Sequence, residues 1–291
     1  MPEMEILNLG ADPHQRGLVH GRHFPTEIRE NIETYLSRFE LAGNKRDAVL
    51  QGGHDWARRI KAFDAEYFAE MTGVAEGAAL PLEQIAVLNA RYELTYLSSM
   101  SETQAGLTAE DQMDGCTAFA ITGEGTAEGH TYAGQNQDLG PEFSDFGIVL
   151  RLAPTDGRPR LVTFTFAGQL GYMGMNEYGV AHFANGLGNA TWRPGLTHYP
   201  LKRRCFELRN VAECVELLRN HRTSSAGNMV FCDGDGGIAD VEIRPDGIAV
   251  FDDEHPCRRL HTNHYVTKEF APHEDGNSPD SCPRLDRLRE M

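Results

Sequence analysis

The sequence predicts an α+β protein in which β-sheets and helices stack in layers. Residues 14–100 place apolar side chains three and four positions apart, which is typical of helices that bury one face. From residue 116 onward, short runs alternate with a period of two, as strands do, and a helical pattern over 199–221 interrupts them. Strands, helices and strands in that order differ from the regular alternation of a doubly wound sheet.

The N-terminal helical region divides into several helices. Ile60, Phe63 and Tyr67 lie on one stripe of a helix, because they recur at spacings of three and four. Pro81 suits the first turn of the last helix, expected over 82–97, because a proline lacks an N–H that the first turn does not need.

The strand-rich region begins at Cys116. Cys116, Ala118 and Ala120 share one face of the first strand, and we expect their small side chains to leave room for a ligand. Between the strands, two helical pieces are expected, with Asn210 capping the second. The expected strands are 116–121, 130–135, 147–152, 161–166, 179–183, 228–232, 237–243 and 247–251.

Composition restricts the function classes. The 291 residues suffice for one large domain or two small ones, and no linker separates the helical part from the strand-rich part. The formal net charge of −16 disfavours nucleic acid and anionic membranes as partners, since both require a basic surface. No apolar leader and no apolar run of membrane-spanning length is present, so we expect a cytoplasmic protein.

The six cysteines do not form the pattern of a disulfide framework. Cys205 and Cys214 lie in a helical pattern and Cys232 in a strand pattern, where buried structural thiols are common. We therefore expect the thiols to be reduced. We also expect the protein to bind neither a metal nor a cofactor.

The stretch Gly115-Cys116 stands apart from these thiols. It follows a polar loop over 101–114, and a glycine before the cysteine leaves the intervening carbonyl open to attack. If the Gly115–Cys116 bond breaks, Cys116 carries both a thiol and a free α-amine. Their ordinary pKa values are close, at about 8.5 and about 8, so the amine can act as the base for the thiol.

Three further polar stretches supply groups for such chemistry. Asp138, in the stretch 134–138, follows Cys116 by the length of one hairpin, and its carboxylate is suited to hold the new amine. Asn263 can donate to the oxyanion of a tetrahedral intermediate. The guanidinium of Arg284 can support a thiolate or an acidic substrate group. Alone, each stretch has an ordinary interpretation. The stretch with Asp138 is more typical of a turn with a capping aspartate, that with Asn263 fits a polar strand end, and that with Arg284 fits a surface loop.

Together these stretches resemble the isopenicillin-N acyltransferase family of autoproteolytic N-terminal nucleophile hydrolases. The related choloylglycine hydrolases and ceramidase-type amidases share the same order of elements. The matching elements are Gly17-x-x-His20-Gly21, Asp114-Gly115-Cys116-Thr117, Asn136-x-Asp138, Asn176-Glu177-x-Gly179-Val180, Asn185-Gly186-Leu187, Thr262-Asn263-His264 and a Ser-rich loop ending in Arg284.

The resemblance implies a four-layer αββα sandwich with a helical N-terminal segment. It also implies self-cleavage between Gly115 and Cys116 into fragments 1–115 and 116–291, which stay together as one globular unit. In this pattern Cys116 is the nucleophile, Asp138 orients its amine, Asn263 forms the oxyanion hole and Arg284 completes the site. The roles in substrate binding would belong to Asn136 and Asn185.

Two departures from the family pattern qualify the resemblance. Gln135 occupies the position at which choloylglycine hydrolases carry an arginine, so the acyltransferase branch fits better. The sequence ends seven residues after Arg284, whereas family members are expected to continue for several strands.

The sequence therefore predicts a cysteine amidohydrolase or acyltransferase that cuts an amide C–N bond through an acyl-enzyme. Its expected partner is a small N-acyl, peptide-like or thioester substrate, with acyl-coenzyme A as a further expected donor. Three alternatives remain open: a non-catalytic binding protein with the same fold, a papain-like thiol protease, and a metal protein that uses Cys257, His261 and His264.

Overall fold

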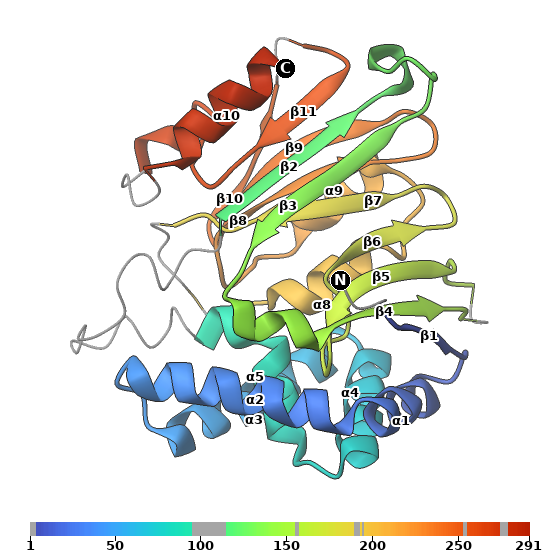
Figure 1. Ribbon diagram of the computed structural model, residues 1–291, viewed down its shortest axis with the longest axis vertical. Helices are drawn as coiled ribbons and strands as arrows, with labels where there is room; N and C mark the ends of the chain where they lie inside the picture. Colours follow the sequence, from blue (N-terminus) through green and yellow to red (C-terminus); the bar gives the residue numbers. More distant parts are fainter. Residues whose placement is uncertain are drawn as a thin grey trace. The chain divides into compact units, whose positions relative to one another are not determined.

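The computed structural model groups the chain into two compact units (Figure 1). It describes residues 4–94, 115–154, 157–188, 193, 195–252, 255–273 and 279–291. Unit 1 comprises Met1–Leu107, Gly140–Tyr172 and Gly195–Arg204, and unit 2 comprises Thr108–Leu139, Met173–Pro194 and Cys205–Met291. Both units are discontinuous in sequence. The predicted boundary between residues 115 and 116 concerns a covalent cut and stays a prediction.

Helices dominate unit 1, as the sequence pattern predicts for the described part of 14–100. Two of them begin at aspartate caps: Asp12 accepts the Gln15 N–H at 2.7 Å and Asp64 accepts the Glu66 N–H at 2.7 Å. The helices are α1 (Pro13–His23), α2 (Pro25–Leu41), α3 (Arg46–Phe63), α4 (Ala65–Ala78), α5 (Leu82–Asn89) and α8 (His198–Cys205).

Glycines allow α1 and α4 to pack backbone to backbone. A Cβ at Gly17 would lie 2.0 Å from the Glu70 carbonyl oxygen, and one at Gly73 would lie 2.1 Å from the His14 carbonyl oxygen. Such distances are far inside van der Waals contact, so only glycine fits at this crossing. The Gly17-x-x-His20-Gly21 stretch of the sequence therefore has a packing role.

The strands of unit 1 form a short mixed ladder. β1 (Ile6–Leu9) pairs in parallel with β4 (Gly147–Leu152), which pairs antiparallel with β5 (Leu161–Phe166). The sequence predicts β4 and β5 with these bounds, whereas β1 was not predicted. A 3-10 helix, η2 (Pro141–Phe146), leads into β4.

Unit 2 contains two antiparallel sheets. In the smaller sheet, β2 (Gly115–Ile121) lies between β3 (Tyr132–Asp138) and β11 (Arg258–His261) (Figure 1). The larger sheet runs in the order β6 (Met173–Asn176), β7 (Ala181–Asn185), β8 (Gly227–Cys232), β9 (Ile238–Arg244) and β10 (Gly247–Phe251). The remaining elements are η1 (Gly123–Gly125), α9 (Val211–Asn220), η3 (Ala271–His273) and α10 (Ser281–Glu290).

The two sheets of unit 2 pack face to face. Ala118 and Ala120 of β2 are fully buried against Ala181, Val230 and Cys232 of the larger sheet. With α10 against β11 and β2, and α9 against β9 and β10, the unit has the four-layer αββα order that the resemblance implies. The expectation of ligand space beside Ala118 and Ala120 is wrong, because their small side chains let the sheets approach instead.

One further expectation needs correction in unit 2. The segment ending in Arg284 was expected as a loop, but Ser281 to Arg284 form the first turn of α10. The stretch that begins at His261 does lie at a polar strand end: His261 is the last residue of β11, a strand that pairs with β2 and was not predicted. The capping role of Asn210 is confirmed, since its Oδ1 accepts the Glu213 N–H at 2.9 Å.

Candidate active site

Cys116 is the second residue of β2 and its side chain is buried, with 2% of its surface exposed. The hairpin expected between Cys116 and Asp138 is confirmed: Cys116 pairs with Gln137, and Gly115 pairs with Asp138. Along β2 the side chains alternate between the buried inner face and a partly exposed outer face. The thiol therefore lies on the inner side, and Thr117 lies on the outer side.

Asn263 holds the backbone nitrogen of Cys116. The Cys116 N–H donates to Asn263 Oδ1 at 2.7 Å, and Asn263 Nδ2 donates to the Gly186 carbonyl oxygen at 3.1 Å. Asn263 follows β11 by two residues, and β11 pairs with β2, so the ladder brings this amide to the start of β2. The amide nitrogen carries two hydrogens, and the bond to Gly186 uses one of them.

Arg284 holds the carbonyl side of the same residue. Its Nη1 donates to the Cys116 carbonyl oxygen at 2.6 Å and to Thr117 Oγ1 at 2.9 Å, while its Nη2 donates to Asn263 Oδ1 at 2.9 Å. Asp280, one helical turn earlier, accepts from Arg284 Nε at 2.9 Å and orients the fork. Because Asn263 Oδ1 receives two donors, the orientation of the Asn263 amide is fixed.

Asp138 lies beside the peptide bond that precedes Cys116. A Cβ at Gly115 would lie 2.8 Å from Asp138 Oδ2, so the carboxylate occupies the space that a side chain at residue 115 would need. Asp138 is exposed and lies on the face that carries Gly115 and Thr117. In the uncut chain, the acceptor for the Cys116 N–H is Asn263, whereas the sequence assigned this nitrogen to Asp138.

Asn136 and Asn185 lie on different sheets. Asn136 is exposed on β3 opposite Thr117, on the other face of the strand from the thiol. Asn185 ends β7 with 2% of its surface exposed, and its Nδ2 donates to Asn228 Oδ1 at 2.8 Å. Gly186, whose carbonyl oxygen binds Asn263, is the next residue, so Asn185 is the better placed of the two.

Gln135 occupies the inner face of β3, opposite Ala118. Its Nε2 donates to the Ala184 carbonyl oxygen at 2.7 Å and approaches Asn185 Oδ1 at 3.4 Å. The neutral amide at this position thus connects the two sheets beside Asn185.

A buried ionic cluster that the sequence analysis missed lies between the two sheets. His261 faces Glu242 Oε1 across 3.1 Å through Nε2, and faces the Thr262 carbonyl oxygen across 2.8 Å through Nδ1. Burial alone would lower the pKa of His261, but the carboxylates of Asp240 and Glu242 raise it. Both ring nitrogens face acceptors, so the ring is a cation that joins β11 to β9 close to Asn263.

The pKa values of two carboxylates of β9 shift in opposite directions, although His261 acts to lower both. Burial raises the pKa of Asp240 to about 6, although His261 and a hydrogen bond from Asn228 counteract it. Burial would also raise the pKa of Glu242, but hydrogen bonds from His261, Thr267 and the Val266 N–H lower it. The sequence signal was Asp240 and Glu242 at alternate positions among the apolar residues of the strand 238–243.

The residues proposed as metal ligands point to different partners. Cys257 Sγ faces Glu124 Oε2 at 3.7 Å, His261 faces Glu242, and His264 Nδ1 faces Ser281 Oγ at 2.7 Å. Across residues 4–94, 115–154 and the other described ranges, no group of three or more His, Cys, Asp or Glu side chains is arranged to hold a metal ion.

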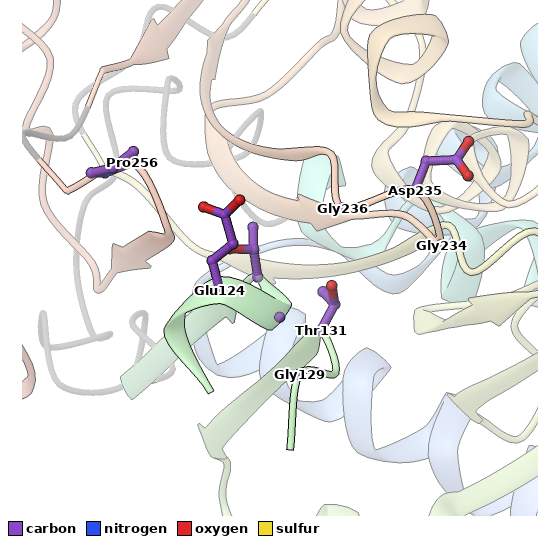
Figure 2. A pocket seen from close by; sticks show the side chains of 9 residues that line it. Glu124, Gly129, Thr131, Gly234, Asp235, Gly236 and Pro256 are labelled. Atoms are coloured by element: carbon purple, nitrogen blue, oxygen red, sulfur yellow. The ribbon is translucent and has the colours of Figure 1, made fainter. Parts of the chain in front are cut away.

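A surface pocket of about 580 Å³ lies at the far end of β2 from Cys116 (Figure 2). Glu124 and Asp235 contribute carboxylates to its lining, and Pro256 forms part of its wall. Its nearest β2 residue, Ile121, is about 17 Å along the strand from Cys116, at roughly 3.3 Å per residue. This hollow is therefore separate from the site around Cys116.

Comparison with known proteins identifies the family. The family model for acyl-coenzyme A:6-aminopenicillanic acid acyl-transferase matches residues 125–291, which is more than half of the chain. The chain belongs to this family. The match includes Asp138, Asn263 and Arg284 and begins after Cys116.

A relative from Emericella nidulans, acyl-coenzyme A:6-aminopenicillanic-acid-acyltransferase 40 kDa form, is 26% identical over 278 residues. The alignment covers 94% of this chain and 68% of the relative.

Two solved structures overlap in part. A mutant conjugated bile acid hydrolase from Clostridium perfringens has a TM-score of 0.38 at 15% identity, with 53% of this chain and 55% of that chain covered. Penicillin V acylase from Agrobacterium tumefaciens has a TM-score of 0.28 at 15% identity, with 48% and 42% covered. The matched region thus spans about half the length of either protein.

The length and the apolar character of the described helices show whether any of them could span a membrane. Within those parts of the chain, none is both long and apolar enough to cross a bilayer.

Proposed function

We propose that this chain is an autoproteolytic cysteine amidohydrolase or acyltransferase that uses Cys116 as its nucleophile. The observation that carries the proposal is that both backbone polar groups of Cys116 are held by side chains: Asn263 accepts from its nitrogen and Arg284 donates to its carbonyl oxygen. Backbone groups in a strand usually pair with a neighbouring strand, whereas at Cys116, beyond the residues that β11 pairs, two side chains take this place. The two side chains lie 147 and 168 residues away in sequence, and they converge on one residue.

Self-cleavage would begin with attack of the Cys116 sulfur on the carbonyl carbon of Gly115. The C–N bond breaks as the C–S bond forms, and the Cys116 nitrogen leaves as an amine after it takes up a proton. Water then hydrolyses the thioester to a Gly115 carboxylate and a free thiol. Gly115 supports this step because it has no side chain to block the carbonyl and because the Asp138 carboxylate adjoins it.

Turnover would use the new amine as the base for the thiol. Asn263 Oδ1 already accepts from this nitrogen, so the same bond would hold the amine after the cut. The second hydrogen of Asn263 Nδ2 would donate to the oxyanion, which reconciles the predicted oxyanion role with the acceptor role in the uncut chain. The resulting acyl-enzyme would be released by water or by an acceptor amine.

Membership of the acyltransferase family supports a class of substrate. We propose a small molecule with an N-acyl or peptide-like amide, or an acyl thioester such as an acyl-coenzyme A, as the acyl donor. Residues 185–186 are the proposed substrate contacts, because Gly186 adjoins Asn263 and Asn185 is fixed by Asn228.

The test compares the wild-type chain with Cys116→Ala and Cys232→Ala. Burial raises the pKa of the Cys232 thiol to about 11, so this matched buried cysteine should be almost entirely protonated at neutral pH. Wild type and Cys232→Ala should release product from a panel of N-acyl amines and acyl thioesters and should react with iodoacetamide fastest at residue 116. Cys116→Ala should do neither.

If Cys116→Ala retains turnover, the thiol is not the nucleophile. If wild type lacks both turnover and selective labelling at Cys116, a non-catalytic binding protein with this fold is the correct description.

A further inference from the structure

We propose that Ser281, Thr262 and His264 form a positioning cluster that fixes Asn263 and Arg284 relative to each other and to Cys116. The inference rests on the proposed function, in which Asn263 and Arg284 act on Cys116. The hydrogen bonds of the three residues join them to the Asn263 backbone and to the start of α10, so they would act through the residues that they hold.

Ser281 is the centre of the cluster, and it is fully buried. Its Oγ accepts the Asn263 backbone N–H at 2.7 Å, faces His264 Nδ1 at 2.7 Å and donates to Thr262 Oγ1 at 2.9 Å. Thr262 Oγ1 in turn donates to the Ser281 carbonyl oxygen at 3.1 Å. Every residue from 262 to 264 is therefore tied to the first residue of α10.

The hydroxyl of Ser281 is engaged by all three residues of the segment 262–264. A serine hydroxyl has one donor hydrogen and can accept two hydrogen bonds. Ser281 Oγ accepts the Asn263 N–H and donates to Thr262 Oγ1, and His264 Nδ1 lies 2.7 Å from Ser281 Oγ and 3.2 Å from Thr262 Oγ1. Three partners around one hydroxyl suit a positioning role for Ser281.

The cluster closes a ring that contains both functional side chains. The backbone N–H of Asn263 donates a hydrogen bond to Ser281 Oγ, and the side-chain oxygen of Asn263 accepts one from Arg284 Nη2. Ser281 and Arg284 lie three residues apart in the first turn of α10, on the side that faces β2 and β11. These two hydrogen bonds connect Asn263 to the first turn of α10. Together they restrict both translation and rotation of α10 relative to β2 and β11.

Restriction of this kind affects rate more than binding. A misplacement of about 1 Å in a reacting group can cost on the order of 10²-fold in rate. Loss of the Ser281 hydroxyl would also leave the buried Asn263 N–H without its acceptor. We therefore expect Ser281→Ala to lower kcat by about 10- to 100-fold, with KM changed less than about threefold.

A double-mutant cycle separates positioning from general stability. If Ser281 acts through Arg284, then Ser281→Ala should lower kcat by less than about threefold when it is added to Arg284→Lys, because the guanidinium that it positions is already gone. If the losses in kcat of the two single variants multiply in the double variant, the inference is contradicted.

Two single variants complete the comparison. Thr262→Ser, which keeps the hydroxyl, should retain most of the kcat that Thr262→Val loses. Cys282→Ala, an exposed neighbour in α10, should match wild type.

A second readout does not depend on turnover. In a Cys116→Ala background, the amide of residue 116 should exchange its hydrogen slowly, because it donates to Asn263 Oδ1. Adding Ser281→Ala should speed this exchange at least tenfold, whereas adding Cys282→Ala should not. Unchanged exchange would overturn the cluster even if the enzyme is active. Faster exchange without any wild-type turnover would leave the cluster in place and refute the proposed function.

Discussion

Arg284 donates from Nη1 to the carbonyl oxygen of Cys116 at 2.6 Å, although the two residues are 168 positions apart. The same guanidinium reaches Asn263 Oδ1, which accepts the Cys116 N–H. A planar fork is required to hold both oxygens at once, and this is the property that distinguishes arginine from lysine. The start of β2 is therefore fixed by a helix at the other end of the sequence.

Arg284→Lys tests this fork. A single ammonium group cannot hold the Cys116 carbonyl and Asn263 Oδ1 in the observed geometry, so the rate of self-cleavage should fall by about 10²-fold. Time courses of fragment formation, followed by mass spectrometry, measure the rate. The matched control is Arg287→Lys, since Arg287 lies on the exposed side of α10 and pairs with Glu290. Equal rates for the two variants would show that the fork is dispensable.

Gly115→Ala tests the placement of Asp138. The new Cβ would lie 2.8 Å from Asp138 Oδ2, so the carboxylate must rotate away from the scissile bond. We expect self-cleavage to slow at least tenfold while the midpoint of urea unfolding shifts little, because only a side-chain end moves. Gly247→Ala is the control, since its Cβ would enter open space. Unaltered cleavage in Gly115→Ala would argue against a role for Asp138 at this bond.

His20 should make unit 1 sensitive to acid. Its Nε2 accepts the Gly168 N–H at 3.1 Å, and burial lowers its pKa to about 4. Between pH 6.5 and 4 the unfolded chain binds a proton at His20 that the folded chain does not, so stability falls as the pH falls. The corresponding loss in unfolding free energy is about 3 kcal/mol by pH 4.

Urea unfolding at pH 7 and pH 4 measures this loss. His20→Gln keeps an acceptor for Gly168 without the titration, so its unfolding free energy should fall by about 3 kcal/mol less than that of wild type. His54→Gln, a change at an exposed histidine of the same unit, should follow wild type. An identical acid response in His20→Gln would exclude a buried neutral imidazole.

Asp240 should give the opposite pH dependence. Burial raises its pKa to about 6, so between about pH 4 and pH 6 the folded chain keeps a proton that the unfolded chain loses. Its contribution to stability therefore declines as the pH rises through this window, by about 3 kcal/mol. Asp240→Asn should remove this decline and keep the hydrogen bond from Asn228.

The measurement is again the unfolding free energy as a function of pH, with Asp235→Asn as the exposed control. A parallel pH profile for wild type and Asp240→Asn would show that Asp240 is ionised throughout and that His261 compensates its charge fully.

The sequence predicts the elements that have clear local signals. The bounds of β4, β5 and β10 match, because apolar alternation ends at turn residues on both sides. By contrast, α10 has only Ser281 and Leu285 among its buried residues, so it lacks an apolar stripe to detect. Pro283 does not interrupt this helix, because a proline is compatible with the first turn.

The sequence indicates which residues form the candidate site, but it does not indicate the hydrogen bonds between them. Cys116, Asn263 and Arg284 meet as expected, yet whether Asn263 presents its oxygen or its nitrogen to Cys116 depends on the guanidinium beside it. The ionic pair of His261 and Glu242 joins two sheets, and no local pattern encodes such a distant contact. Contacts of this kind come from the tertiary arrangement of strands.

The most direct test of the central claim is the intact mass and N-terminal sequence of the purified wild-type protein. The account predicts two fragments, one ending at Gly115 and one beginning at Cys116, whose masses sum to that of the 32.3 kDa chain plus one water. A single uncut chain that keeps its Gly115–Cys116 bond after prolonged incubation would contradict it.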